Sequence, residues 1–186
     1  MVLRRFAAVA CAAALVVAPG VASGLVGAAS AGVGAVRKAA QPSFPYRLVP
    51  TPGQDLELVV PNLGFRDCLD LENMTGSYVL HWQCHSQTNQ RWRFVDAGDG
   101  YWAIKPLGFP ADCVDVEGVT GPYVVRWPCH GGANQSWDIW VVTTNAARVS
   151  PRSNRATCLD ATFPDARVVV LPCDDRKSTQ AWGIAR

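Results

Sequence analysis

Two segments of the chain carry the same four functional side chains at the same spacing. The residues are Asp70, Trp82, His85 and Asn89 in the first segment, and Asp115, Trp127, His130 and Asn134 in the second. A carboxylate accepts hydrogen bonds from neighbouring hydroxyl groups, an aromatic ring stacks on C–H groups, and an amide both donates and accepts. This combination is complementary to a sugar, which has hydroxyls on its rim and C–H groups on one face.

Each residue type also has a structural explanation. An Asp after a Cys-Leu pair can cap a turn, a tryptophan can belong to the core, and a histidine can lie on the surface. A third segment of the chain keeps the acidic residue, Asp160, but has Leu171, Asp174 and Thr179 at the other three positions. Because the set is complete twice and is lost together once, we expect binding by the first two segments and a structural role for the third.

These segments belong to a threefold internal repeat with a period of 45 residues, the distance from Trp92 to Trp137 and from Trp137 to Trp182. A period of this length is typical of repeated supersecondary units. The repeats span about residues 56–100, 101–145 and 146–186. Each repeat contains a Gln-x-Trp motif near its end. The glutamines and tryptophans of the three motifs are Gln90, Trp92, Gln135, Trp137, Gln180 and Trp182.

Short runs rich in Val, Leu and aromatic residues, separated by Gly, Asn, Pro or Asp, predict four β-strands in each repeat. The predicted ranges are 56–60, 68–71, 78–82, 91–95, 101–104, 113–116, 123–127, 136–141, 147–149, 158–161, 167–171 and 181–184. No helical period persists for three turns, so we expect little helix. The sequence therefore predicts an all-β domain of about twelve short strands over residues 56–186.

The N-terminus has the pattern of a secretory signal peptide. Two arginines, Arg4 and Arg5, precede an apolar run over 6–17 and then small residues. A membrane anchor is the alternative, but the run of about 12 apolar residues is shorter than the roughly 20 that span a bilayer. We expect a signal peptide over 1–23, with cleavage as late as residue 35, and a secreted, extracellular protein without membrane insertion.

Residues 24–55 are rich in Ala, Gly and Pro, and we expect them to form an extended lead-in. Prolines at 42, 45, 50 and 52 are predicted to interrupt any regular element there. The folded domain is therefore expected to begin near Leu56.

The chain has seven cysteines, and removal of Cys11 with the signal peptide leaves two in each repeat. An even number of cysteines in an exported protein indicates disulfides. The repeat favours one bridge inside each copy, between Cys68 and Cys84, Cys113 and Cys129, and Cys158 and Cys173. A metal site is the alternative, but the chain has no Cys-x-x-Cys motif and its two candidate histidines belong to different repeats. We expect neither a metal nor a cofactor.

The net charge of +2 argues against nucleic acid as a partner, because such proteins carry a basic stripe. Catalysis is also not expected. Asp70 and His85 have no partnered Ser or Cys nucleophile in a triad-like arrangement, and no pair of carboxylates is singled out for hydrolysis of a glycosidic bond. We expect a monomer that is not an enzyme.

The repeated pattern, Cys-x-Asp followed by an aromatic residue and then Cys-His-x-x-x-Asn-Gln-x-Trp, resembles the ricin B-chain type β-trefoil lectins. It is most similar to the carbohydrate-binding modules of secreted actinobacterial glycosidases, over about residues 56–186. The resemblance implies a six-stranded barrel capped by three hairpins, with the Gln-x-Trp residues in a shared core. One departure is that Leu80 and Val125 replace a Gln often found two residues before the aromatic residue.

The resemblance further implies a secreted lectin that binds glycans or polysaccharides through repeats one and two, with galactose- or xylan-type sugars favoured. The alternative is a trefoil that acts through protein contacts, as a secreted inhibitor or as the cell-binding subunit of a larger complex. Loss of the two pocket aspartates would abolish the first activity and leave the second intact.

Overall fold

A computed structural model describes residues 45–53, 55–60, 66–162 and 166–185 of the chain. The predicted signal peptide and its cleavage site, together with most of the lead-in, lie outside the described residues. Within them there are thirteen strands, four short 3-10 helices and no α-helix, so the all-β prediction is confirmed. Among the residues that the structure describes, no helix has the length and apolar character needed to cross a membrane.

Twelve strands follow the predicted plan of four in each repeat. The first repeat contains β2 (Asp55–Val60), β3 (Asp67–Leu71), β4 (Val79–Gln83) and β5 (Trp92–Asp96). The second contains β6 (Trp102–Pro106), β7 (Asp112–Val116), β8 (Val124–Pro128) and β9 (Trp137–Thr143). The third contains β10 (Ala146–Pro151), β11 (Thr157–Asp160), β12 (Val169–Pro172) and β13 (Gly183–Ala185). The 3-10 helices are η1 (Glu72–Met74), η2 (Thr88–Gln90), η3 (Ala133–Gln135) and η4 (Ser178–Gln180).

The first and last strands of the repeats form a closed barrel. β2 pairs with β5, β5 with β6, β6 with β9 and β9 with β10, all antiparallel. β13 pairs with β2, and two backbone hydrogen bonds of 2.7 and 2.9 Å between Ala147 and Trp182 complete the circle. Closure removes the unpaired edges that many short strands would otherwise expose. The architecture is the expected β-trefoil.

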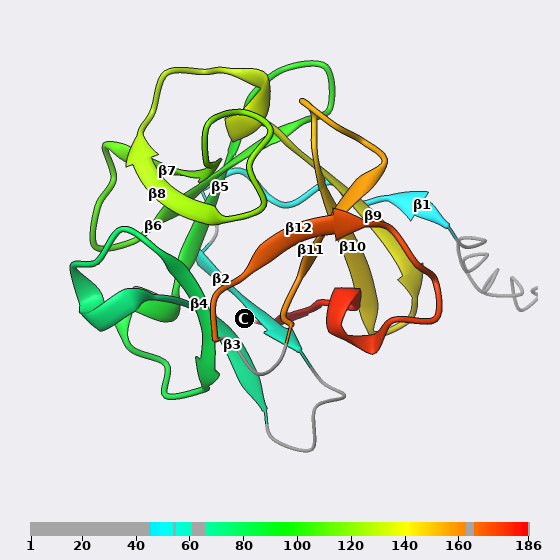
Figure 1. Cartoon of the computed structure of the whole chain (residues 1–186), viewed down its shortest axis with the longest axis horizontal. Coiled ribbons are helices and arrows are strands. Elements are labelled where there is room, and N and C mark those ends of the chain that lie inside the picture. The colour runs from blue at the N-terminus through cyan, green and yellow to red at the C-terminus, as the bar shows by residue number, and fades with distance from the viewer. Residues whose placement is uncertain (1–44, 54, 61–65, 163–165, 186) are drawn as a thin grey trace, which may run out of the picture. The chain divides into compact units, whose positions relative to one another are not determined.

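The two middle strands of each repeat form the hairpins β3–β4, β7–β8 and β11–β12 (Figure 1). The hairpins also contact one another. Isolated bridges join Tyr78 to Val125, Tyr123 to Val169, and Arg167 to Leu80. Each hairpin therefore contacts both of the others, so residues from one repeat can reach the surface of the next.

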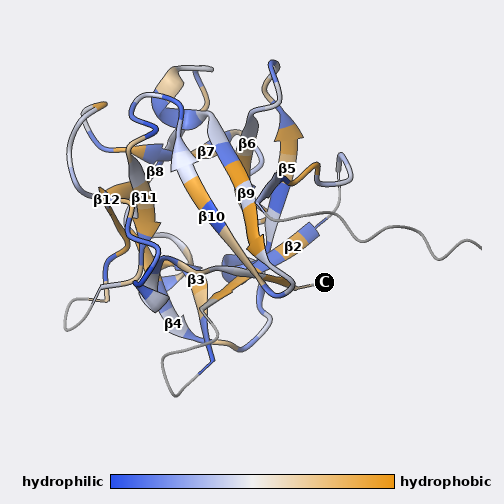
Figure 2. Cartoon of the chain, turned by 90° about the vertical axis from the view of Figure 1, so that its right-hand side faces the viewer, coloured by the Kyte–Doolittle hydropathy of each residue, from blue (hydrophilic) through white to orange (hydrophobic). Residues whose placement is uncertain are grey.

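The core is built from alternating strand positions, as the hydrophobic and hydrophilic segments along β9 and β10 illustrate (Figure 2). Trp92, Trp137 and Trp182 have no exposed surface. Each indole N–H donates to a backbone carbonyl 23 residues earlier in the chain, at 2.9 to 3.0 Å. A buried indole needs such a partner, so each tryptophan both fills the core and fixes the first strand of its hairpin to the barrel.

The expectation that the lead-in has no regular element is wrong for one short stretch. β1 (Tyr46–Arg47) pairs with β9, with Tyr46 opposite Val141 and Arg47 opposite Trp140. A two-residue strand at a sheet edge fits between Pro45 and Pro50, because neither proline has to donate to the ladder. The pairing partner lies about 90 residues away in the sequence, so local composition gave no sign of it.

The side chain of Arg47 anchors β1. Its guanidinium group lies 2.8 and 2.9 Å from the carboxylate of Asp138, which is fully buried and also has Arg155 at 3.3 Å. Arg47→Ala should lower the free energy of unfolding by about 2 kcal/mol, because a buried carboxylate loses its nearest charged partner. Urea denaturation monitored by tryptophan fluorescence measures this change.

Arg152→Ala is the matched control, because Arg152 is half-exposed and pairs with the exposed Asp99 at 3.2 Å. An exposed ion pair contributes less than about 1 kcal/mol. Equal losses in the two variants would contradict the anchoring role of Arg47.

Three disulfides join Cys68 to Cys84, Cys113 to Cys129 and Cys158 to Cys173, each inside one repeat as predicted. Each bridge links the start of a hairpin's first strand to the residue that follows its second strand. In the chain-entropy description, closing a loop of this size adds roughly 3 kcal/mol by restricting the unfolded chain. The bridges also hold together the ends of the hairpins on which the predicted sites lie.

Candidate sugar-binding site

Each predicted site is assembled from one hairpin and the 3-10 helix that follows it. In repeat one, β3 supplies Asp70, β4 supplies Trp82 and η2 supplies Asn89. In repeat two, β7, β8 and η3 supply the matching residues at the same positions. The disulfide at the base of the hairpin and the buried Gln-x-Trp motif fix the helix against the first strand.

The carboxylate at the centre of each site is a hydrogen-bond acceptor for two neighbouring amides. Asp70 accepts from Asn89 at 2.8 Å and from Gln90 at 2.6 Å, one bond to each oxygen. Asp115 accepts in the same way from Asn134 at 2.7 Å and from Gln135 at 2.6 Å. Both carboxylates are only 4% exposed, so the protein holds them rigidly beneath the surface.

The glutamine of the Gln-x-Trp motif has a second role that sequence analysis missed. Besides donating to Asp70, Gln90 donates to the carbonyl of Gln83 at 3.0 Å and accepts from the backbone N–H of His85 at 2.7 Å. It therefore connects the hairpin, the site carboxylate and the loop that carries the histidine. The period of the motif indicated burial, but only the folded chain shows that the glutamine also orients the carboxylate.

The histidines lie against the carboxylates in one defined tautomer. The backbone N–H of Gln87 donates to Nδ1 of His85 at 3.3 Å, and Nε2 of His85 lies 3.3 Å from Asp70. The second repeat repeats this arrangement, with Gly132 N–H donating at 3.2 Å to His130, whose Nε2 lies 3.2 Å from Asp115. Since Nδ1 accepts, the proton is on Nε2, which donates to the carboxylate.

Burial raises the pKa of the Asp70 carboxyl above its ordinary value. Desolvation is the largest influence and outweighs the hydrogen bonds from Gln90 and Asn89 and the contact with His85, which all lower the pKa. The ionised carboxylate thus exchanges part of its hydration for protein donors. A ligand hydroxyl that reaches it would add one more donor to a poorly solvated acceptor.

The two site tryptophans differ sharply from the core tryptophans. Trp82 is 57% exposed and Trp127 is 58% exposed, whereas the Gln-x-Trp tryptophans are completely buried. Each lies on the second strand of its hairpin, directly across from a disulfide cysteine, Cys68 or Cys113. A strand therefore presents an open indole in each hairpin, and in repeat two this indole lines one pocket together with the buried carboxylate of Asp115.

In repeat two all four predicted residues line one open pocket of about 620 Å³. Ligand pockets in proteins have volumes of about 300–1,000 Å³. The neighbouring repeat also lines this pocket through Ser77 and Tyr78, and Val119 contributes an apolar side chain, which was not predicted from the sequence. Tyr78 lies 45 residues before Tyr123, so the sequence indicates that it belongs to the repeat. This spacing does not indicate that Tyr78 lines a pocket.

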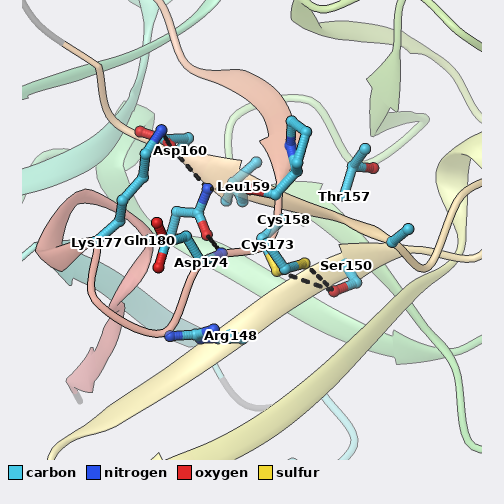
Figure 3. Close-up of a disulfide and its surroundings, with 12 residues drawn as sticks. Arg148, Ser150, Thr157, Cys158, Leu159, Asp160, Cys173, Asp174, Lys177 and Gln180 are labelled. Atoms are coloured by element: carbon cyan, nitrogen blue, oxygen red, sulfur yellow. Dashed lines mark hydrogen bonds and ion pairs between the residues drawn. A yellow bond between two sulfur atoms is a disulfide. The ribbon is translucent and has the colours of Figure 1, made fainter.

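The third repeat has a different arrangement around its carboxylate (Figure 3). Asp160 has no exposed surface, accepts from Gln180 at 2.8 Å and has the Lys177 ammonium group 3.6 Å away. The residue at the histidine position, Asp174, is bonded to Arg176, which lowers the pKa of Asp174. The ammonium group of Lys177 thus balances the charge of the Asp160 carboxylate. Leu171, at the position of the exposed tryptophans, has no aromatic ring for stacking.

No three His, Cys, Asp or Glu side chains within the described ranges are grouped so that they could hold a metal ion. The imidazole contacts in both sites are made to carboxylates and to backbone N–H groups.

The chain matches the family of ricin-type beta-trefoil lectin domains over residues 58–182. Among solved structures it is similar to the designed threefold-symmetric protein ThreeFoil, with 27% identity and a TM-score of 0.63, over 71% of this chain and 98% of that chain. It is also similar to the Macrolepiota procera ricin B-like lectin solved with lactose, with 20% identity and a TM-score of 0.60, over 75% and 99% of the two chains.

A third similar structure is the GlcNAcα1-4Gal-releasing endo-β-galactosidase of Clostridium perfringens, with 15% identity and a TM-score of 0.60. The match covers 70% of this chain and only 32% of that enzyme. Comparison with curated protein sequences gave no significant match.

Proposed function

This chain belongs to the ricin-type beta-trefoil lectin domain family, and we propose that it is a secreted carbohydrate-binding protein with pockets in repeats one and two. The observation that carries the proposal is that one pocket is lined by all four predicted residues of repeat two, Asp115, Trp127, His130 and Asn134. Repeat one has the same residues, with the same hydrogen bonds to its carboxylate. Secretion is supported by the apolar N-terminal run and by the three disulfides.

The hydrogen bonds limit how a sugar can bind. An ionised carboxylate offers about four acceptor positions. Three of them at Asp70 are already used by Asn89, Gln90 and His85. One sugar hydroxyl can therefore donate to each carboxylate directly, and a second must displace the histidine, whose contact at 3.3 Å is the longest of the three.

The aromatic platform supplies the second part of the recognition. Trp82 and Trp127 expose more than half of their surface, and Trp127 lines one pocket with Asp115. A pyranose that stacks its C–H face on the indole places rim hydroxyls toward the carboxylate and the imidazole. Galactose- or xylan-type glycans are proposed as ligands, in keeping with the lactose bound to the Macrolepiota procera lectin.

We further propose that the chain binds sugars without transforming them. In the described part of the chain, neither His85 nor His130 makes a hydrogen bond to a Ser, Thr or Cys side chain. Without an activated nucleophile, or a second free carboxylate across a glycosidic bond, the site can bind a sugar but has no means of cleaving it.

A glycan array probed with the purified chain tests the proposed function. We expect signals for galactose- or xylan-type glycans that disappear in the Trp82→Ala/Trp127→Ala double variant, while the circular dichroism spectrum stays unchanged. Signals that persist in the double variant would place binding elsewhere. A folded protein with no signal on any glycan would favour action through protein contacts.

A further inference from the structure

The turn after β7 displays an apolar side chain toward the repeat-two pocket. Val119 lines this pocket together with Trp127, and 51% of its surface is exposed. Met74, 45 residues earlier, occupies the matching position in repeat one and is 46% exposed. Together with Trp82, Trp127 and Val49, these two are the large hydrophobic residues that the described chain exposes most.

The backbone at Val119 is unfavourable for the residue it carries. Its φ angle is +71°, held by a hydrogen bond of 3.1 Å from its N–H to the carbonyl of Val116. A β-branched residue is a rare outlier at such an angle, whereas Gly or Asn adopts it readily. The turn would therefore be more stable with another residue, and burial does not explain the valine because half of it is exposed.

The valine extends the apolar part of the pocket beyond the aromatic platform. Trp127 alone provides a surface for the C–H face of a sugar ring. Val119 and Tyr78, the latter from the neighbouring repeat, add apolar surface to the pocket. The hydroxyl groups on the rim of an unsubstituted sugar are not complementary to this surface. A hydroxyl packed against them would lose its water without gaining a partner, whereas a methyl group would gain contact.

We propose that Val119 is a specificity residue of the repeat-two pocket, and that this pocket prefers a pyranose carrying a methyl-terminated substituent. Two common sources of such a group are the 6-methyl of a deoxyhexose and the methyl of an N-acetylamino sugar. The inference rests on the proposed function. Repeat one, with the flexible Met74 at the same position, discriminates less because a thioether side chain adapts its shape.

The test uses the full chain with Trp82→Ala, so that only repeat two binds. Isothermal titration compares the methyl glycosides of D-galactose, D-fucose (6-deoxygalactose) and N-acetyl-D-galactosamine. We expect one of the two methyl-bearing sugars to bind about fourfold more tightly than the galactoside, the gain for one buried methyl group. The sugar that binds more tightly identifies whether the pocket takes the methyl of a deoxyhexose or that of an N-acetyl group.

Val119→Thr keeps the β-branched shape and replaces one methyl by a hydroxyl that solvent can reach. It should abolish the fourfold preference, measured as the ratio of the affinities for the methyl-bearing sugar and the galactoside. Val119→Gly should also abolish the preference while raising the melting temperature, because it relieves the backbone. Met74→Thr, the control in repeat one, should change none of the three affinities.

Equal affinities for the three sugars, or a preference that survives Val119→Thr, would overturn the role of Val119. Failure of the proposed function looks different. In that case no glycoside binds, or Trp127→Ala in the same background leaves the affinities unchanged.

Discussion

Replacing Trp92, Trp137 or Trp182 by alanine will lower the free energy of unfolding by about 3–5 kcal/mol. Each side chain is completely buried, so its removal leaves a cavity among rigid strands that cannot collapse. Each substitution also leaves a backbone carbonyl without its indole donor, that of Leu69 in the case of Trp92. Urea denaturation monitored by far-ultraviolet circular dichroism measures the loss.

Trp82→Ala and Trp127→Ala are the matched controls, since they remove the same side chain from exposed positions. Surface substitutions usually change stability by about 0.5 kcal/mol or less. The two classes of tryptophan should therefore differ by several kcal/mol in the same assay. If Trp82→Ala unfolds the protein and Trp92→Ala does not, the assignment of core and site tryptophans is reversed.

Loss of either exposed tryptophan should weaken binding to a galactan or xylan polymer by about a hundredfold. A shallow pocket with one stacking surface and a few hydrogen bonds binds a simple sugar at about millimolar strength, near −4 kcal/mol. The two proposed sites lie on different hairpins, β3–β4 and β7–β8, so one short oligosaccharide is not expected to fill both. We expect a long polymer to reach both, and the second contact then raises the apparent affinity on the order of a hundredfold.

Surface plasmon resonance on the immobilised polymer measures the loss, and calorimetry with a monosaccharide gives the comparison. Trp127→Ala should halve the number of monosaccharide sites without changing the affinity of the other site. Leu171→Ala, at the equivalent position of repeat three, should change neither result. A hundredfold loss in Leu171→Ala, or the same loss with mono- and polysaccharide, would contradict two cooperating pockets.

Aspartate substitutions test the same idea less cleanly. Asp70 is almost fully buried and accepts from two amides, so Asp70→Ala leaves Asn89 and Gln90 without partners. Unpaired buried donors cost about 1–3 kcal/mol each. A loss of binding in Asp70→Ala could then result from a loss of stability. Substitutions of the exposed tryptophans avoid this ambiguity.

The sequence alone could not show how many acceptor positions of each carboxylate remain open to a ligand. The sequence placed Asp70, His85 and Asn89 in one site, and they do lie together. It did not reveal that Gln90 is a further donor, or that the protein itself uses three of the acceptor positions. The chemistry of a residue follows from its type, but its free capacity depends on how many neighbours have already bonded to it.

The sequence by itself determined the features that are local or periodic. The 45-residue period identified the three repeats and the cysteine pair in each of them. Short runs of Val, Leu and aromatic residues predicted the twelve strands of the repeats. These features could be predicted because they depend on residues that are close together in the sequence. Burial of Trp92 was also expected, because the resemblance of the repeated Gln-x-Trp motif implies a position in the shared core.

Only the tertiary structure decided what depends on closure of the barrel and contact between repeats. The pairing of β1 with β9, and the entry of Tyr78 into the pocket of the next repeat, join residues about 90 and 50 positions apart. No local pattern encodes these contacts, because they form when three hairpins assemble around one axis and the barrel closes. Local periodicity fixes which face of a strand is buried, and assembly fixes which neighbour covers it.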